Sequence, residues 1–206
     1  MEKIDEVQGN KFVETLLEGI FPIYGVQNGR NAIYAYLDNL ISMPPDNKLS
    51  LAVFHELGHA LNHNVSKIGK TLQKMKMPGM TIASSLAMFA FCSKESKAED
   101  GKELTKAQKA KNLVRKNVGP LAFLSLTPML IEEAMASVKG CKWANKNMAQ
   151  DLAKKVTKTN AIAYCSYLIG AVGLALGAHV ALRVKDALVA KKEAKLEAKQ
   201  ADKFSA

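Results

Sequence analysis

Apolar residues follow a helical spacing in the segment from residue 46 to residue 64. The side chains of Asp46, Asn47 and Ser50 precede the apolar positions and are typical of helix N-caps. The positions that recur every three or four residues are Leu51, Phe54, Leu57, Gly58 and Leu61. The pattern therefore predicts one amphipathic helix in this segment.

Residues 1 to 45 mix apolar and polar positions without a sustained period. Turn signals in this region stand at Tyr24-Gly25, Asn28-Gly29 and Pro44-Pro45. We expect short helices here, with a turn or hairpin near Gly25 to Gly29.

A long apolar stretch near the C-terminus, Ala161 to Leu182, has the length of a membrane span. As a helix it would extend over roughly 33 Å, which is sufficient for the hydrocarbon core of a bilayer. Gly170, Gly173 and Gly177 lie within it, as small residues do where membrane helices pack closely. The alternative is a core helix of a soluble domain. We favour the membrane, because a chain of 206 residues has little material to cover every face of such a helix.

Two shorter apolar stretches, Met77 to Cys92 and Val118 to Ile131, precede this span. They predict a helical hairpin joined by the polar run from Ser93 to Asn117, which lies either in the membrane or in a soluble core. The tail after Leu182 is rich in Lys, Ala and Glu, which is typical of a solvated helix or a frayed end. The predicted fold is therefore mainly α, with a domain over 1–160 that contains the hairpin 77–131, a transmembrane helix over 161–182 and a tail over 183–206.

Composition narrows the classes of partner. The formal net charge of +10 comes almost entirely from lysine and would suit either nucleic acid or an anionic membrane surface. Aromatic residues make up only 6% of the chain and no nucleic-acid-binding motif accompanies the lysines, so we expect membrane lipid and not nucleic acid. The three cysteines lack metal-site spacing and indicate neither a disulfide framework nor a thiolate zinc site. The N-terminus does not resemble a signal peptide, so we expect an internal segment to enter the membrane.

One motif in the first predicted helix points to chemistry. His55-Glu56-Leu57-Gly58-His59 fits the H-E-x-x-H pattern, and three of the four histidines of the chain lie between residues 51 and 64. Two histidines four residues apart on a helix face the same way, so both imidazoles can reach one metal ion. Glu56 lies beside that position, where it can take a proton from an attacking water and pass it to a leaving amine.

A zinc site needs at least a third protein ligand. His63 is a poor candidate, because a straight helix cannot bring three successive turns to one ion. The metzincin extension would require Gly and His where Asn62 and Val65 stand. The segment from Thr127 to Ser137 contains adjacent carboxylates after an apolar stretch, so we expect the third ligand to be a glutamate from this segment.

The two neighbouring glutamates, Glu132 and Glu133, differ in what shares their face of a helix. They point about 100° apart, so only one can face the ion. Positions three and four after Glu133 are Ala136, which permits close approach, and Ser137, whose hydroxyl can bond a ligand. This offset favours Glu133 as the ligand and leaves Glu132 as a surface or substrate-facing charge.

Taken together, these residues resemble the membrane-associated zinc metallopeptidases of the HtpX and CAAX-prenyl-protease type and their YugP-like relatives. The resemblance covers roughly residues 46 to 145 and rests on the H-E-x-x-H motif followed by Asn62 and Asn64, on two apolar helices, and on an E-x-x-A-[D/S] pattern at Glu133. It implies a gluzincin-like helical domain with Zn²⁺ on His55, His59 and Glu133, and with Ser137 and Asn62 supporting the ligands. The HtpX-type enzymes usually have aspartate in place of the serine, and no motif assigns a residue that stabilises the transition state.

The resulting hypothesis is a zinc-dependent endopeptidase with Glu56 as general base, acting on a peptide or protein substrate. The resemblance implies an integral protein of the bacterial cytoplasmic membrane with its active site on the cytoplasmic face. The alternative is a non-catalytic membrane protein with a degenerate or structural metal site. A third hypothesis, a lysine-rich nucleic-acid or membrane-surface binder, predicts salt-dependent DNA binding that does not require His55.

Overall fold

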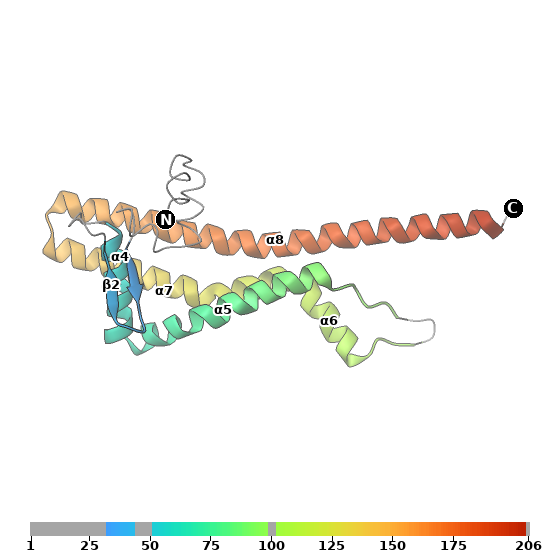
Figure 1. Ribbon diagram of the computed structural model, residues 1–206, viewed down its shortest axis with the longest axis horizontal. Coiled ribbons are helices and arrows are strands. Elements are labelled where there is room, and N and C mark those ends of the chain that lie inside the picture. Colours follow the sequence, from blue (N-terminus) through green and yellow to red (C-terminus); the bar gives the residue numbers. More distant parts are fainter. Residues whose placement is uncertain (1–31, 44–50, 99–101, 205–206) are drawn as a thin grey trace, which may run out of the picture. The chain divides into compact units, whose positions relative to one another are not determined.

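The computed structural model describes residues 32–43, 51–98 and 102–204. Helices account for 83% of these residues, in five helices accompanied by one two-stranded sheet (Figure 1). The prediction of a mainly α fold is confirmed. The predicted turn near Gly25 to Gly29 and the predicted N-cap residues Asp46, Asn47 and Ser50 lie outside the described residues.

A β-hairpin occupies part of the region in which short helices were expected, and that expectation is wrong for residues 33 to 42. Strand β1 (Ile33–Ala35) pairs antiparallel with β2 (Leu40–Ser42), and Tyr34 lies opposite Ile41. The turn between the strands contains Asn39 with φ of 52°, a left-handed conformation that asparagine tolerates better than most residues. Strands of three residues are too short to produce a readable alternation, which explains the error.

Helix α4 (Ala52–Val65) contains the H-E-x-x-H motif, and α7 (Val118–Asn147) packs against it in antiparallel register. A Cβ atom on Gly58 would lie 1.9 Å from the carbonyl oxygen of Ala136, and a Cβ atom on Gly140 would lie 2.1 Å from that of Phe54. One turn beyond Gly58, Asn62 Nδ2 bonds the carbonyl oxygen of Glu132 at 3.3 Å. The contacts thus move four residues back along α7 for every four residues forward along α4, as in antiparallel helices. Glycine at two of these contacts permits the backbones to touch.

The remaining helices extend beyond the apolar stretches that predicted them. Helix α5 (Lys67–Cys92) begins ten residues before the predicted stretch, and α8 (Gln150–Phe204) includes both the predicted span and most of the tail. Helix α6 (Lys106–Lys116) lies within the run expected to be a polar connection. It begins with a capping box, in which the Thr105 side chain accepts from the backbone of Gln108 and the Gln108 side chain accepts in return.

The chain divides into two compact units, each with its own apolar cluster. The first comprises Met1–Lys74 and Met129–Tyr167, and the second comprises Met75–Pro128 and Leu168–Ala206. In the first unit the cluster is built on Phe54, whose ring lies 5.9 Å from that of Trp143, together with Ala144, Ala153 and Val156. In the second unit the cluster consists of Ala90, Val118, Ala178 and Leu182. Alanine is frequent in both clusters, which lets helices approach closely.

Among the described helices, α7 and α8 are long and apolar enough to cross a membrane. In the most apolar window of α8 only 17% of residues are buried within the protein. Large apolar side chains of this helix, including Ile169, Leu176 and Val180, are exposed. An apolar helix whose side chains face outward differs from the core helix of a soluble domain, and this agrees with the predicted membrane association.

The three glycines of α8 have no close neighbour among the described residues, although their spacing suggested a packing role. A Cβ atom on Gly170, Gly173 or Gly177 would meet no described atom within 4 Å. Close helix packing at these positions is therefore not observed in the described part of the chain. The glycines that do permit close approach in the second unit are Gly79, against Ser125, and Gly119, against Ala175.

Candidate metal centre

Helix α4 presents two imidazoles on one buried face. His55 and His59 are only 5% and 7% exposed, and their rings meet edge to face with centroids 4.6 Å apart. Their Nε2 atoms lie 3.1 Å from each other, so both rings direct the same nitrogen to one point. The four-residue spacing on a helix produces this convergence.

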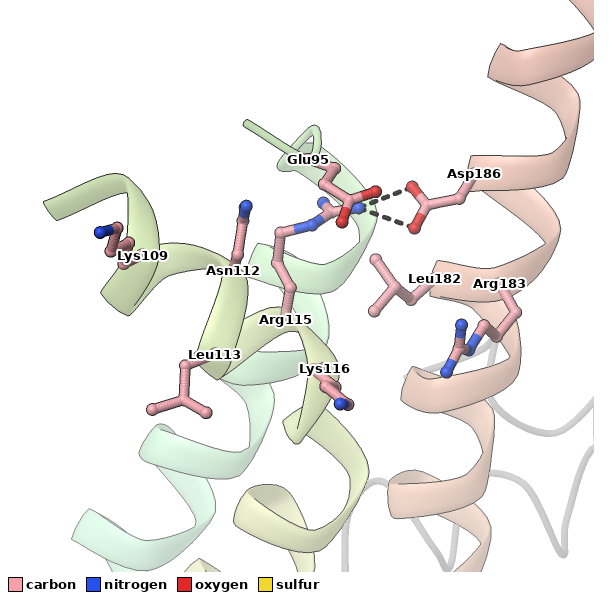
Figure 2. Close-up of a pocket in the computed structure, with 9 residues that line it drawn as sticks. All are labelled: Glu95, Lys109, Asn112, Leu113, Arg115, Lys116, Leu182, Arg183 and Asp186. Carbon is pink, nitrogen blue, oxygen red and sulfur yellow. Dashed lines mark hydrogen bonds and ion pairs between the residues drawn. The ribbon is translucent and has the colours of Figure 1, made fainter. Parts of the chain in front are cut away.

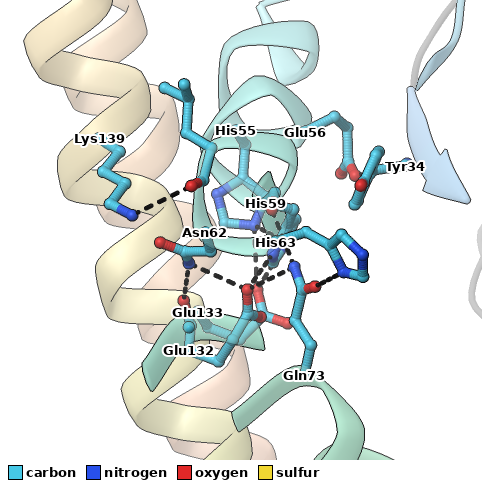
Figure 3. Close-up of polar contacts among 12 residues, drawn as sticks. Tyr34, His55, Glu56, His59, Asn62, His63, Gln73, Glu132, Glu133 and Lys139 are labelled. Carbon is cyan, nitrogen blue, oxygen red and sulfur yellow. Dashed lines mark hydrogen bonds and ion pairs between the residues drawn. The ribbon is translucent and has the colours of Figure 1, made fainter. Parts of the chain in front are cut away.

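Helix α7 brings a carboxylate to the same point (Figure 3). Oε2 of Glu133 lies 2.9 Å from Nε2 of His55 and 3.4 Å from Nε2 of His59. These three residues form a group whose ligand atoms could hold one metal ion. Donor atoms arranged tetrahedrally at about 2.0–2.1 Å from zinc lie about 3.3 Å from one another. The observed separations of 2.9, 3.1 and 3.4 Å are close to this value, so the three donor atoms are compatible with one metal ion of the size of zinc.

The close contact between α4 and α7 makes this geometry possible. Gly58 lies between the two histidines in sequence and touches the backbone of Ala136, one turn of α7 after Glu132 and Glu133. A side chain at position 58 would separate the helices and withdraw the carboxylates from the imidazoles. Position 58, one of the two variable positions of the H-E-x-x-H motif, therefore requires glycine in this protein.

Glu132 is fully buried beside His59, so the expectation that it could be a surface charge is wrong. Oε1 of Glu132 lies 2.8 Å from Nδ1 of His59, on the side of the ring opposite to the metal-facing nitrogen. A carboxylate in this position holds the imidazole as the tautomer whose Nε2 is free to bind a metal. The adjacent glutamates thus face different nitrogens, and the 100° turn between them separates a ligand position from a supporting one.

Amides hold Glu132 in place. Asn62 and Gln73 each donate to Oε1 of Glu132 at 3.0 Å, and the amide of Gln73 also donates to the carbonyl oxygen of His59. Because both donor bonds of Gln73 come from its nitrogen, its oxygen faces His63 and accepts from Nδ1 at 3.0 Å. His63 therefore ends a hydrogen-bonded chain and lies outside the donor cluster, as its position on the helix led us to expect.

Ser137 supports the other histidine. Its Oγ lies 3.2 Å from Nδ1 of His55, one turn of α7 beyond Glu133. Each imidazole therefore has a polar partner on Nδ1, a hydroxyl for His55 and a carboxylate for His59. Such partners fix ring orientation in metal sites.

Glu56 lies next to the cluster without belonging to it. Its Oε2 accepts a hydrogen bond of 2.7 Å from the backbone N–H of Tyr34, so the hairpin holds this carboxylate against α4. Burial raises the pKa of Glu56, and the nearby His59 and His55 and the Tyr34 N–H oppose this rise. The role of the hairpin could not be foreseen, because its strands are separated from the motif by residues that carry no pairing signal.

The electrostatics of the cluster favour a cation. Burial by itself lowers the pKa of His59, but the hydrogen bonds to Glu132 and Glu133 and the charges of these carboxylates together outweigh burial and raise the pKa to about 9. Two carboxylates that are 0% and 2% exposed would be costly to bury without positive charge beside them. The chemistry of the donor set therefore suits a divalent cation held by two imidazoles and one carboxylate.

One further aromatic residue borders the site. The ring of Tyr167, at the end of the first unit, stacks on His55 with centroids 6.3 Å apart and an interplanar angle of 15°. Tyr167 is 37% exposed, whereas the histidine beneath it is buried. Sequence patterns gave no signal for it, because it lies within the apolar stretch of α8 and no motif surrounds it.

Comparisons of the chain with models of known protein families, with curated proteins and with solved structures find no match.

Proposed function

We propose that this chain is a membrane-associated zinc endopeptidase in which His55, His59 and Glu133 hold the metal and Glu56 is the general base. The observation that supports the proposal most strongly is the convergence of three buried donor atoms within 3.4 Å of one another, with one further acidic residue, Glu56, adjacent on α4. Zinc bound there would supply a Lewis acid that polarises a peptide carbonyl and makes water more acidic.

The chain's own residues have separable roles in this proposal. Glu132 and Ser137 orient the two imidazoles through Nδ1, and Asn62 and Gln73 hold Glu132. Glu56 accepts a proton from the attacking water and returns it to the leaving amine. The N–H of Tyr34 fixes one oxygen of Glu56.

The wider setting belongs to the same proposal. We propose that the chain resembles the HtpX and CAAX-prenyl-protease type or its YugP-like branch in function, in the bacterial cytoplasmic membrane, with the site on the cytoplasmic face and a peptide or protein substrate. The outward-facing apolar residues of α8 support the membrane part of this assignment.

A second candidate function is a structural metal site in a non-catalytic membrane protein. The burial of all three donor residues favours it, because structural zinc sites are closed whereas catalytic ones keep a position open to substrate.

Hydrolysis of unfolded casein by the purified full chain distinguishes the two candidates. The peptidase proposal predicts cleavage by the wild type and none by Glu56→Gln, with equal zinc content in both proteins, since the substitution removes the base and leaves the ligands in place. A wild type that carries zinc without cleaving casein supports the structural site. Wild-type turnover in Glu56→Gln contradicts the assigned role of Glu56.

A further inference from the structure

In the second unit, three apolar helical segments have their ends in one buried cluster. Ala90 near the end of α5, Val118 at the start of α7 and Leu182 of α8 belong to one buried cluster. A Cβ atom on Gly119 would lie 3.0 Å from the carbonyl oxygen of Ala175, so α7 and α8 touch next to this cluster. The apolar part of each segment lies on one side of this cluster, and the sequence on the other side of the cluster is rich in lysine.

Several charged residues next to this cluster form contacts that hold the helices together. Arg115 of α6 is 3% exposed and binds both carboxylate oxygens of Asp186 of α8, at 2.6 and 2.8 Å. Arg115 also donates to the hydroxyl of Ser93 at 2.8 Å. Lys185 donates to the carbonyl oxygens of Ala90 and Phe91 at the end of α5 and to that of Ser93 just after it.

A cavity of about 500 Å³ lies between α6 and α8 next to this cluster (Figure 2). Its lining contains four basic and two acidic side chains, the acidic ones being Glu95 and Asp186, so an excess of positive charge faces the cavity. Arg115 is neutralised by Asp186, and Lys109 pairs with Glu103 at 2.9 Å. Lys116 and Arg183 are exposed, and neither side chain has a hydrogen bond or ion pair with another described residue.

The surroundings of these two cations indicate the kind of ligand. Leu113 and Leu182 also line the cavity, and Leu113 is 63% exposed. Val180 and Val184, on the same stretch of α8, are exposed as well. If α8 spans the bilayer, Arg183 lies directly after the apolar segment and therefore at the depth of the headgroups. A basic cavity bordered by apolar side chains at this depth suits a phosphate group carried on acyl chains better than a free anion.

We propose that the cavity between α6 and α8 binds the phosphate-bearing headgroup of an anionic membrane lipid through Lys116 and Arg183. The pair of buried Arg115 and half-buried Asp186 forms a rigid floor, because both ends of the guanidinium are bound. The inference concerns the second unit alone and does not depend on metal binding or peptidase activity.

Native mass spectrometry of the full chain tests the proposal, with protein released from micelles that contain equal amounts of phosphatidylglycerol and phosphatidylcholine. The wild type should retain phosphatidylglycerol in preference. The double substitution Lys116→Gln with Arg183→Gln should reduce that preference by roughly 25-fold, because each basic residue near an anionic lipid contributes about a factor of five.

Two matched controls make the result specific. Lys191→Gln with Lys195→Gln removes the same charge from exposed positions of α8 that do not line the cavity, and should keep the preference. Lys116→Arg with Arg183→Lys keeps the charge and should also keep it, which shows that the cavity tolerates substitution. Three results would overturn the proposal: an undiminished preference in the Gln double variant, an equal loss in the control at 191 and 195, or displacement of the lipid by inorganic phosphate at equal concentration.

Discussion

The carboxylate of Glu132 lies 2.8 Å from Nδ1 of His59, although 73 residues separate them, and neither group is open to solvent. This contact makes Glu132 the residue that orients one imidazole, while its neighbour Glu133 faces Nε2 of both histidines. Two adjacent carboxylates of the same type thus have different expected effects on the metal.

Substitution of the two glutamates should separate these roles. Glu133→Gln removes the charged donor, whereas Glu132→Gln keeps a polar side chain near His59, and loss of such a supporting partner typically costs 10- to 100-fold in metal affinity. We expect zinc affinity to fall by roughly that factor in Glu132→Gln and by clearly more in Glu133→Gln, measured by competition with a chelator. Equal losses would indicate that both carboxylates bind the ion, and a larger loss in Glu132→Gln would reverse the assignment.

The contact between Gly58 and Ala136 should be intolerant of even one methyl group. A Cβ atom at position 58 would lie 1.9 Å from a backbone oxygen, so Gly58→Ala must push α4 away from α7. We expect a loss of stability of about 2 kcal/mol or more and weaker zinc binding. Gly173→Ala is the matched control, because a Cβ atom there meets no described atom within 4 Å and alanine favours a helix by about 1 kcal/mol.

Thermal unfolding in detergent, followed by circular dichroism, measures both variants. Gly58→Ala should unfold at a lower temperature than the wild type, and Gly173→Ala at the same or a higher temperature. Unchanged stability and zinc affinity in Gly58→Ala would show that α4 and α7 are not in backbone contact.

Membrane attachment should withstand alkaline carbonate. Exposed apolar residues of α8 such as Ile169 and Leu176 would be buried in lipid, and this burial does not depend on charge. We therefore expect the full chain in the membrane pellet after carbonate washing and after high salt. Release by high salt would instead indicate peripheral attachment through lysines, since salt screens surface charges.

The elements that could be predicted from the sequence are those with a regular or continuous pattern of apolar residues. Helical spacing identified the helix around His55, because one buried face imposes a regular pattern, and continuous apolar stretches identified the apolar parts of α5, α7 and α8. The first turns of α5 were missed because Lys67 to Lys76 includes four lysines and has little apolar character. The hairpin at Tyr34 was missed because three-residue strands do not establish a period.

The candidate site, like the fold, could be predicted from local sequence patterns only in part. His55, His59 and Glu133 were chosen from local spacing, and the structure brings their donor atoms together. The partners that orient them could not all be chosen in this way. Gln73 contacts Glu132 across 59 residues, and the Tyr34 N–H that binds Glu56 belongs to the backbone and has no side-chain signature. Such contacts depend on how helices and strands pack, which local patterns do not specify.

The central claim is that two imidazoles and one carboxylate of this chain hold zinc. Elemental analysis of the full chain purified in detergent, compared with His55→Ala prepared in the same way, tests it most directly. We predict about one zinc ion per chain in the wild type and essentially none in His55→Ala, because the variant loses a ligand from a site with three protein donors. A wild type without zinc, or a variant that retains as much zinc as the wild type, would contradict the claim.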